Sequence, residues 1–598
     1  MLQQIQSHKF KLRLTLGLLI FCSLAIAIKL FAIQVFASSY YRKASIDNSV
    51  RIVPIRAPRG TIVDRNDQVI VRNRLSYSVY LVPHDVPDIN KAAASLADML
   101  NMDEAYLKQI IAAGWKGRFQ PIRLKRDVDF ATVSILEEHS LDVPGLVFQV
   151  EPTRLYPDSG FGSHLYGYVG EVSESELANG KESFKKGDLI GKKGLERYYN
   201  SYLKGRDGVL YLEVSAKGRI LGKYPYKHEQ APVTGATLTL NIDWELQKYA
   251  ESLLVDKGQG AVVAIDVNDG GVLALASSPL FDANLFSGVV TPDRWAQIMA
   301  DSTFPLLNRV VQGVYPPGST FKAFTAAMAL HYDKVSEERG FDGCRGQKKF
   351  GNRVFKCWRP GGHGKLDLHA AIVQSCDIYF YQLGLACGME LFEQFMPECR
   401  LGQLTGIDIP GEKVGLSPTI KYFDERYGKR GWTKYLMNNL AIGQGEILVT
   451  PMQMAVLYAA LANGGIIYEP HIVHKISDEN GDEIKILPKK LADLPISEAH
   501  RLIIVDALAG VVGEAHGTAS WLRLPDIAIA GKTGTAQNPH GDNHAWFVCF
   551  APAENPRIAV AVIVENAGHG SSIAAPIARD VVKFFIQGKP TIKANEPA

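Results

Sequence analysis

Three short polar runs in the C-terminal half of the chain constrain its fold most strongly, because they make chemical sense only as parts of one site. In chain order they are Ser319-Thr320-Phe321-Lys322, Ser375-Cys376-Asp377 and Lys532-Thr533-Gly534-Thr535. A hydroxyl and an amine three residues apart lie on one face of a helix, a turn apart. Lys322 can then take the proton of Ser319 and make its hydroxyl a nucleophile. The runs therefore predict a fold that joins a helix start to two further polar walls around a reactive serine.

The surroundings of Ser319 distinguish it from two other serines that have a lysine three residues on. Ser183 and Ser201 lie in charged stretches interrupted by glycines, whereas Ser319 follows Tyr315-Pro316-Pro317-Gly318 and opens the apolar run Phe321 to Leu330. This context predicts a serine at a helix start, where backbone N–H groups and the helix dipole favour developing negative charge. The alternative is a serine that only caps the helix, beside a solvated lysine. The other two runs favour the reactive serine.

The three runs resemble the active-site motifs SxxK, SxN and K[TS]G of the penicillin-binding proteins and serine β-lactamases. The flanking residues 439–445 (NLAIGQG), 450–455 (TPMQMA) and 532–537 (KTGTAQ) are similar to the high-molecular-weight transpeptidases in particular. Asp377 departs from the usual pattern, which has Asn at that position. Ser-x-Asp, together with Phe281-Asp282-Ala283-Asn284, resembles the elongation-specific subgroup, penicillin-binding protein 2.

This resemblance implies a role for each residue of the runs. Ser319 would attack a peptide ending in D-Ala-D-Ala, with Lys322 as general base and Ser375 relaying a proton to the leaving amine. An amine of a neighbouring stem peptide would then take the acyl group. Lys532 and the Thr533-Gly534-Thr535 segment would hold the carboxylate of the donor, and the N–H groups of Ser319 and Thr535 would form the oxyanion hole.

The charge of Asp377 would affect Lys322. An ionised carboxylate near Lys322 would favour the charged ammonium and oppose its service as a base. We therefore expect one of two arrangements. Either Asp377 stands back from Lys322, or the two residues titrate as a unit.

The N-terminal apolar stretch predicts a membrane anchor. Residues 14–36 form a span of about 23 residues, with Lys29 as its one charged residue, and this is long enough to cross a bilayer. The alternative is a cleaved signal peptide, because Ala25-Ile26-Ala27 resembles a cleavage site. Basic residues flank the span on both sides and barely decide its orientation. From the resemblance we expect residues 1–13 in the cytoplasm, a single span in the inner membrane, and the catalytic part in the periplasm.

Residues 37–235 predict a second domain that carries none of the three runs. Strand-like alternation in residues 50–66, and the segment Gly194 to Tyr199, are similar to the non-catalytic pedestal domain of the class B penicillin-binding proteins. Within it, about residues 85–150 form a head insert, with helices expected at 90–100, 103–113 and 129–138. We expect an elongated, mainly β pedestal whose arginines and glutamates form structural salt bridges at the surface.

The remaining residues, 236–590, predict an α+β catalytic domain, followed by a tail at 591–598. Ala236 to Ile242 alternates as a strand, Asp243 caps a helix, and Gly260 to Asp266 and Gly271 to Ser277 form a hairpin. Further strands are expected at 545–550 and 557–565. The pattern, and the family likeness, predict an antiparallel sheet covered by helices on both faces.

Four residues near the middle run have the character of a metal site. Cys344, Cys357, His363 and Cys376 frame a polar, Gly-rich loop with no obvious core of its own, and three thiolates with an imidazole suit tetrahedral zinc. Asp342 is a substitute ligand. A Cys344–Cys357 disulfide, or free thiols, are the alternatives. Metal on Cys376 would hold Ser375 and Asp377 in place.

Three classes of function remain open on the sequence. They are a peptidoglycan D,D-transpeptidase that is inhibited by β-lactams, a D,D-carboxypeptidase or β-lactamase, and a non-catalytic β-lactam receptor. A pedestal and an anchor favour the first, and about 13 residues before the span are too few for a signalling domain. A net charge of +3 without basic blocks argues against nucleic acid binding. Glycan polymerisation would come from a partner, which the resemblance implies is a SEDS-family glycosyltransferase of the rod complex.

Overall fold

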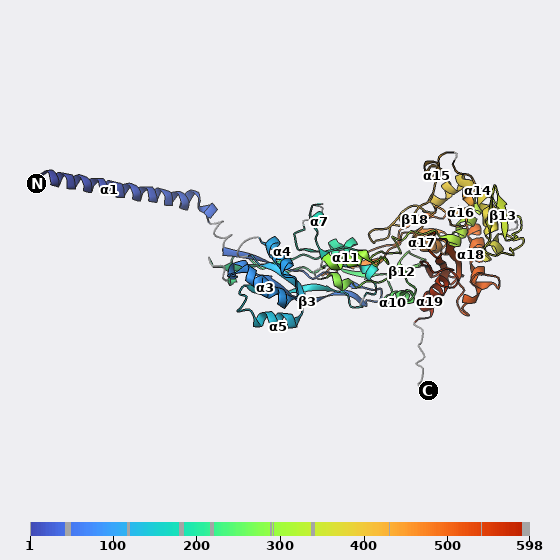
Figure 1. Ribbon diagram of the computed structural model, residues 1–598, viewed down its shortest axis with the longest axis horizontal. Helices are drawn as coiled ribbons and strands as arrows, with labels where there is room; N and C mark the ends of the chain where they lie inside the picture. Colours follow the sequence, from blue (N-terminus) through green and yellow to red (C-terminus); the bar gives the residue numbers. More distant parts are fainter. Residues whose placement is uncertain are drawn as a thin grey trace, which may run out of the picture.

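The chain forms an elongated molecule, with the N-terminal helix at one end and the C-terminal helices at the other (Figure 1). The computed structural model describes residues 2–588, apart from 42–48, 116–119, 159, 179–183, 216–219, 288–289, 291, 337–340, 430 and 540. The C-terminal tail predicted at 591–598 therefore lies outside the described residues, as does Ser183.

Helix α1 (Leu2–Phe31) continues into a π-helical turn, η1 (Ala32–Phe36). Within it, His8–Phe36 is the only segment of the described chain long and apolar enough to cross a membrane, and none of it is buried against the protein. The helix begins well before residue 14, where the span was expected to start. Residues 2–13 contain neither Gly nor Pro, so nothing in their sequence stops the helix.

The pedestal consists of strands in several sheets, joined by short helices. Its main strands are β1 (Val50–Ile55), β2 (Ile62–Val63), β3 (Val69–Leu81), β4 (Ile122–Val128), β5 (Leu146–Leu155), β8 (Gly208–Val214) and β9 (Ile220–Lys223). Two short strands, β6 (Val169–Glu171) and β7 (Leu189–Gly191), lie among the helices α6 (Ser163–Tyr166), α7 (Glu174–Ala178), α8 (Gly194–Tyr198) and α9 (Asn200–Leu203). Strands β1, β8 and β9 form one sheet, and β3 pairs with β5 along ten residues of β5.

The head insert has a hydrophobic core of its own. Its helices are α3 (Ile89–Leu100), α4 (Glu104–Gly114) and α5 (Phe130–Glu138), and their buried leucines pack with β4 and the end of β3. Asp88, Asp103 and Asp129 cap the three helices by accepting backbone hydrogen bonds. These caps fix helix starts within a residue of those expected from the sequence.

The C-terminal part is built on a five-stranded antiparallel sheet in the order β12-β11-β21-β20-β19. Its strands are β11 (Gly260–Asp266), β12 (Val272–Ser278), β19 (Ala530–Ala536), β20 (His544–Ala551) and β21 (Ile558–Val564). Every residue of β21 is buried, and alternate residues of a strand face opposite sides, so both faces of the sheet are covered. The expected α+β architecture is confirmed.

Helices cover this sheet and surround the site. They are α10 (Trp244–Val255), α11 (Pro292–Ala300), α12 (Lys322–His331), α13 (Leu368–Val373), α14 (Asp377–Glu398), α15 (Ile420–Tyr427), α16 (Leu436–Ala441), α17 (Pro451–Ala462), α18 (Glu498–Gly513) and α19 (Ala574–Gln587). Helices α10 and α19 pack together on the sheet, α17 packs on β11, β20 and β21, and α18 packs on β19. Two small two-stranded sheets stand outside it. One is the hairpin of β13 (Gln347–Phe350) and β14 (Arg353–Lys356), and the other pairs β15 (Ile466–Tyr468) with β18 (Lys490–Asp493).

The two parts of the chain share a mixed sheet. Strand β10 (Thr237–Leu240) runs parallel to β2 of the pedestal and antiparallel to β16 (Val473–Ser477), which pairs with β17 (Glu483–Lys485). The pedestal is therefore joined to the catalytic part by backbone hydrogen bonds as well as by the chain itself.

One cluster of pedestal salt bridges is buried, although the sequence predicted such pairs at the surface. Glu196, which is 0% exposed, accepts from Arg59 Nη2 at 2.6 Å and from Arg154 Nε at 2.5 Å. Burial alone would raise the pKa of Glu196, but Arg154 and Arg59 lower it below its usual range. The expectation was wrong for this cluster because Arg59, from the loop after β1, Arg154, from β5, and Glu196, from α8, meet inside the pedestal.

Candidate active site

The nucleophile candidate lies on a tight turn that leads into a helix. Ser319 belongs to the 3-10 turn η4 (Gly318–Phe321), and Lys322 is the first residue of α12. Gly318 has a φ of 56°, and a Cβ there would lie 2.8 Å from the carbonyl oxygen of Thr535. The left-handed backbone and this close approach both favour glycine. Ser319 is half-buried, whereas Lys322 is fully buried.

Strand β19 forms the wall opposite this turn. It carries Lys532, Thr533, Gly534 and Thr535 at the edge of the sheet. A Cβ on Gly534 would lie 2.9 Å from Thr320 Cγ2 and 3.0 Å from the carbonyl oxygen of Pro317. Gly534 therefore allows the strand to pack directly on the serine turn.

Gln444 holds the end of this strand. Its Nε2 donates to the carbonyl oxygen of Thr535 at 2.9 Å, and its Oε1 accepts from the N–H of Gln537 at 3.3 Å. The sequence placed Gln444 in a family-like flank without giving it a role. The structure shows that it fixes the backbone beside Thr535.

The middle run joins the end of α13 to the start of α14. Ser375 has a φ of 54°, a left-handed conformation uncommon for a residue other than glycine. Lys322 Nζ donates to the Ser375 carbonyl oxygen at 2.9 Å and to Ser375 Oγ at 3.1 Å. The first two runs therefore meet through the amine of Lys322.

Asp377 does not stand back from Lys322. Its Oδ1 lies 2.7 Å from Lys322 Nζ, and its Oδ2 accepts from the N–H of Trp358 at 3.0 Å. Among the contacts of the described residues, Lys322 makes no hydrogen bond with Ser319. The amine is held by Ser375 and Asp377, so the first of the two expected arrangements, in which Asp377 stands back from Lys322, is not seen.

Lys532 is buried beside the same group of residues. Its Nζ donates to the carbonyl oxygen of Thr533 at 3.2 Å. Burial, and then the charge of Lys322, lower the pKa of Lys532 well below its usual value, while Asp377 opposes this shift. A carboxylate placed here would restore the charged form of Lys532.

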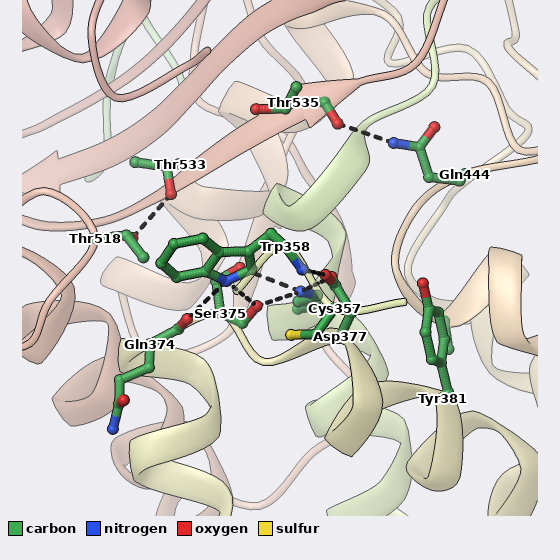
Figure 2. Close-up of polar contacts among 12 residues, drawn as sticks. Cys357, Trp358, Gln374, Ser375, Asp377, Tyr381, Gln444, Thr518, Thr533 and Thr535 are labelled. Atoms are coloured by element: carbon green, nitrogen blue, oxygen red, sulfur yellow. Dashed lines mark hydrogen bonds and ion pairs between the residues drawn. The ribbon is translucent and has the colours of Figure 1, made fainter. Parts of the chain in front are cut away.

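Thr518 is a residue of the site that the sequence did not indicate. It lies on the connection from α18 to β19, and its Oγ1 shares a 2.9 Å hydrogen bond with Thr533 Oγ1 (Figure 2). Threonine in a connecting segment carries no signal of its own. Only the fold brings it to β19.

The four expected metal ligands come together. The ligand atoms of Cys344, Cys357, His363 and Cys376 all lie within 4.8 Å of one another. His363 Nδ1 is 3.5 Å from the sulfur of Cys357, and its buried Nε2 has no hydrogen-bond partner among the described residues. A hydrogen bond from Cys376 lowers the pKa of Cys357. The residues fit a tetrahedral soft cation such as zinc.

Two other readings of this region do not match the structure. All seven cysteines are free, including Cys344 and Cys357, so the expected alternative of a disulfide between them is not seen. Asp342, the expected substitute ligand, lies apart from the cluster, with its side chain 82% exposed and 2.5 Å from Lys348 Nζ.

Comparison with protein families matches most of the chain. Residues 54–240 match the penicillin-binding protein dimerisation domain, and residues 260–583 match the penicillin-binding protein transpeptidase domain. The three runs, the serine turn and β19 all lie in the second match.

Curated relatives and solved structures agree with these matches. Peptidoglycan D,D-transpeptidase MrdA of Acinetobacter baumannii is 31% identical over 98% of this chain and 88% of the relative, and MrdA of Escherichia coli K12 is 30% identical over 98% and 95%. Penicillin-binding protein 2 of Helicobacter pylori, solved in complex with MreC, has a TM-score of 0.77 at 27% identity, covering 90% of this chain and 99% of that one. Penicillin-binding protein 2 of Pseudomonas aeruginosa, solved in complex with WCK 5153, has a TM-score of 0.68 at 30% identity, covering 92% and 100%.

Proposed function

This chain belongs to the class B penicillin-binding proteins, in the penicillin-binding protein 2 group of peptidoglycan D,D-transpeptidases, and from this premise we propose the residues that carry the reaction. The enzyme cross-links peptidoglycan stem peptides and is inhibited by β-lactams. Ser319 is the acylated residue, and Lys322 its general base. The observation that carries this proposal is the buried Lys322 amine, one helical turn after Ser319 and hydrogen-bonded to both Ser375 and Asp377.

The reaction proceeds by two acyl transfers. Ser319 Oγ attacks the carbonyl of the penultimate D-alanine while its proton passes to neutral Lys322. The peptide bond to the terminal D-alanine breaks, and the leaving amine receives the proton of Lys322 through Ser375. An amine of a second stem peptide then attacks the ester and passes a proton to Lys322, which returns it to Ser319 Oγ as the ester bond breaks. Asp377 Oδ1 lies 2.7 Å from Lys322 Nζ and stabilises the positive charge that the amine carries once it has taken the serine proton.

Substrate orientation falls to β19. Lys532, with the hydroxyls of Thr533 and Thr535, holds the terminal carboxylate of the donor peptide. The N–H groups of Ser319 and Thr535 stabilise the oxyanion. Gly534 serves this site by letting the strand approach the serine turn, as the short distances around it support.

The direct test is intact mass of the full chain after penicillin treatment. We expect one adduct per chain in the wild type and none in Ser319→Ala. Ser201→Ala is the matched control, because Ser201 in α9 also has a lysine three residues on, and it should label normally. A Ser319→Ala protein that is still labelled, while folded, would refute the assignment.

The same experiment separates the other two classes of function. A β-lactamase would hydrolyse its adduct, so a stable adduct argues against an efficient hydrolase. Incubation with a pentapeptide donor and an acceptor amine then distinguishes a transpeptidase from a carboxypeptidase and from a non-catalytic receptor. We expect a cross-linked dimer, whereas a carboxypeptidase gives only the trimmed peptide and a receptor gives neither.

We further propose that Cys344, Cys357, His363 and Cys376 hold a structural zinc ion. The cluster is supported by its donor set and by the way it ties the loop after α12 to the start of α14. The metal takes no part in the acyl transfer, but Cys376 lies between Ser375 and Asp377. Zinc would therefore help to fix the segment that binds Lys322.

Metal analysis and acylation rates test this site together. We expect about one zinc per chain, loss of zinc in Cys376→Ser, and slower penicillin acylation in that variant. Cys387→Ser is the control, since Cys387 is buried outside the cluster. Unchanged acylation in a folded, metal-free Cys376→Ser protein would refute the coupling between zinc and the site.

We propose the same placement and division of the chain as the sequence suggests. Residues 1–13 lie in the cytoplasm, 14–36 span the inner membrane, 37–235 form the pedestal, and 236–590 form the periplasmic catalytic domain. The apolar helix and the extracytoplasmic position of peptidoglycan support this order. A reporter fused to the C-terminus should be active only in its periplasmic form.

Partners of the rod complex, including a SEDS-family glycosyltransferase, are proposed on the same basis. A related structure is described as coordination of polymerisation and cross-linking by a peptidoglycan synthase complex, with a TM-score of 0.71 at 28% identity. Co-purification of the full chain from membranes with such a glycosyltransferase tests this. A chain whose first helix is replaced by an unrelated span is the control.

A further inference from the structure

Trp358 is an exposed residue whose two N–H groups both point to the segment around Ser375. It follows Cys357, two residues after β14, and is 58% exposed. Its indole Nε1 donates to the carbonyl oxygens of Gln374 at 3.2 Å and Ser375 at 3.1 Å (Figure 2). Its backbone N–H donates to Asp377 Oδ2. A large exposed apolar side chain gains little from this position by burial, so its hydrogen bonds are the feature that needs explanation.

Trp358 and Lys322 bind the same two acceptors. The Ser375 carbonyl oxygen accepts from both the indole and Lys322 Nζ, and the two oxygens of Asp377 are divided between the Trp358 N–H and Lys322 Nζ. With Oδ2 held, the Asp377 carboxylate cannot rotate away without losing a bond. Oδ1 is therefore directed at the amine.

The backbone at Ser375 also needs this support. A left-handed conformation at a residue other than glycine persists only where the surroundings hold it. The indole bonds the carbonyl groups on both sides of the Ser375 Cα atom, one from Gln374 and one from Ser375 itself. Trp358 thus fixes the peptide units that set where Ser375 Oγ meets Lys322.

We propose that Trp358 is a positioning residue for the acylation step, acting through Ser375 and Asp377 on the amine of Lys322. This inference rests on the proposed roles of Ser319 and Lys322. Trp358 exchanges no proton and need not touch the substrate. Its contribution is the orientation of the two groups that hold the general base.

The test compares two substitutions, one that removes the indole hydrogen-bond donor and one that removes the aromatic ring. Trp358→Phe keeps an aromatic ring and removes the indole donor. Trp358→Gln removes the ring but keeps a donor, because Gln Nε2 is as many bonds from Cα as Trp Nε1. Both keep the backbone N–H. Trp521→Phe is the matched control, since Trp521 is also 58% exposed and its indole has no hydrogen bond among the described residues.

Penicillin acylation of the full chain is measured so that non-covalent binding and the first-order acylation constant are separated. In Trp358→Phe we expect the acylation constant to fall roughly three- to tenfold, the cost of about one neutral hydrogen bond, with the dissociation constant changed less than about twofold. Trp358→Gln should acylate faster than Trp358→Phe, and Trp521→Phe should match the wild type. Zinc content and melting temperature are recorded for each protein.

Several results would overturn the proposal. If Trp358→Phe acylates within about twofold of the wild type, or if Trp358→Phe is faster than Trp358→Gln, the ring and not the donor is what matters. A change confined to the dissociation constant would make the indole a ligand contact instead. Which of Trp358→Phe and Trp358→Gln acylates faster decides between the donor and the ring, even if both substitutions lower the melting temperature. A wild type without an adduct at Ser319 would refute the proposed function itself, whereas a labelled wild type with unaffected variants would refute only this inference.

Discussion

Replacing Glu196 by Gln tests the buried charge cluster of the pedestal with almost no change in shape. The side chains of Glu196, Arg154 and Arg59 are 0%, 1% and 9% exposed. The substitution leaves two guanidinium groups without their carboxylate, and breaking a buried ion pair in this way costs about 3–5 kcal/mol. Arg154 keeps a bond to the Gly60 carbonyl oxygen and Arg59 one to Asn200 Oδ1, so the expected cost is that of one broken ion pair.

The expected change in melting temperature follows from the size of the unit. For 150–250 residues, 1 kcal/mol shifts the melting temperature by about 2–4 °C, which gives a loss of about 6–20 °C. Because the pKa of Glu196 is lowered in the folded state, its contribution is complete above the unfolded pKa and disappears only as the pH falls through the folded pKa. Calorimetry of the detergent-solubilised full chain at pH 7 therefore measures the whole effect.

A matched surface pair provides the control for this experiment. Lys475 and Glu483 are 2.8 Å apart with side chains 27% and 39% exposed, and Glu483→Gln should leave the melting temperature almost unchanged because solvent screens such a pair. If the first transition of Glu196→Gln moves no further than that of Glu483→Gln, the buried cluster does not stabilise the pedestal, and the reasoning is wrong.

Three further predictions concern protonation and the β19 wall. Burial raises the pKa of Glu251 to about 8. Because the carboxyl ionises first in the unfolded chain, the wild type should lose stability relative to Glu251→Gln as the pH rises from about 5 to 8. Chemical denaturation across that range shows whether the free energy of unfolding falls in this way. Binding of a D-Ala-D-Ala peptide to Ser319→Ala should take up protons at a pH above the lowered pKa of Lys532, because the peptide carboxylate favours the charged amine. Calorimetry in buffers of different ionisation enthalpy measures this proton uptake. Binding without proton uptake would mean that Lys532 does not contact the carboxylate. Thr518→Val should weaken non-covalent penicillin binding about three- to tenfold through loss of the bond to Thr533, while Thr518→Ser should restore it; equal effects of Val and Ser would refute a role for the hydroxyl.

Local sequence signals predicted the elements that depend on local chemistry. The head helices begin where Asp88, Asp103 and Asp129 cap them, and the Gly260–Asp266 strand pairs with its neighbour as the turn between them predicts. The span predicted at 14–36 lies within a longer helix that begins at Leu2, because helical propensity continues into the polar residues before the span.

Features that depend on distant partners could not be predicted. A glutamate such as Glu196 is expected at the surface from its residue type. It is buried because Arg59 and Arg154, which are far away in sequence, surround it in the fold. The contacts of Trp358 run through main-chain groups, which carry no residue-type signal. The sequence left open whether Asp377 lies close to Lys322. Only the fold shows that Asp377 Oδ1 is 2.7 Å from Lys322 Nζ.

The sheet that joins β2, β10 and β16 bears on how the chain is assembled and how it can be divided. A ribosome delivers β2 and β3 first, yet their sheet is complete only after β16 and β17 have been made. A fragment covering residues 54–240 would expose the free side of β10, and one covering 260–583 would leave β16 without that partner. Exposed strand edges recruit other chains, so each fragment alone should aggregate more readily than the whole. The boundary drawn between the two family matches is therefore a poor place to cut the protein.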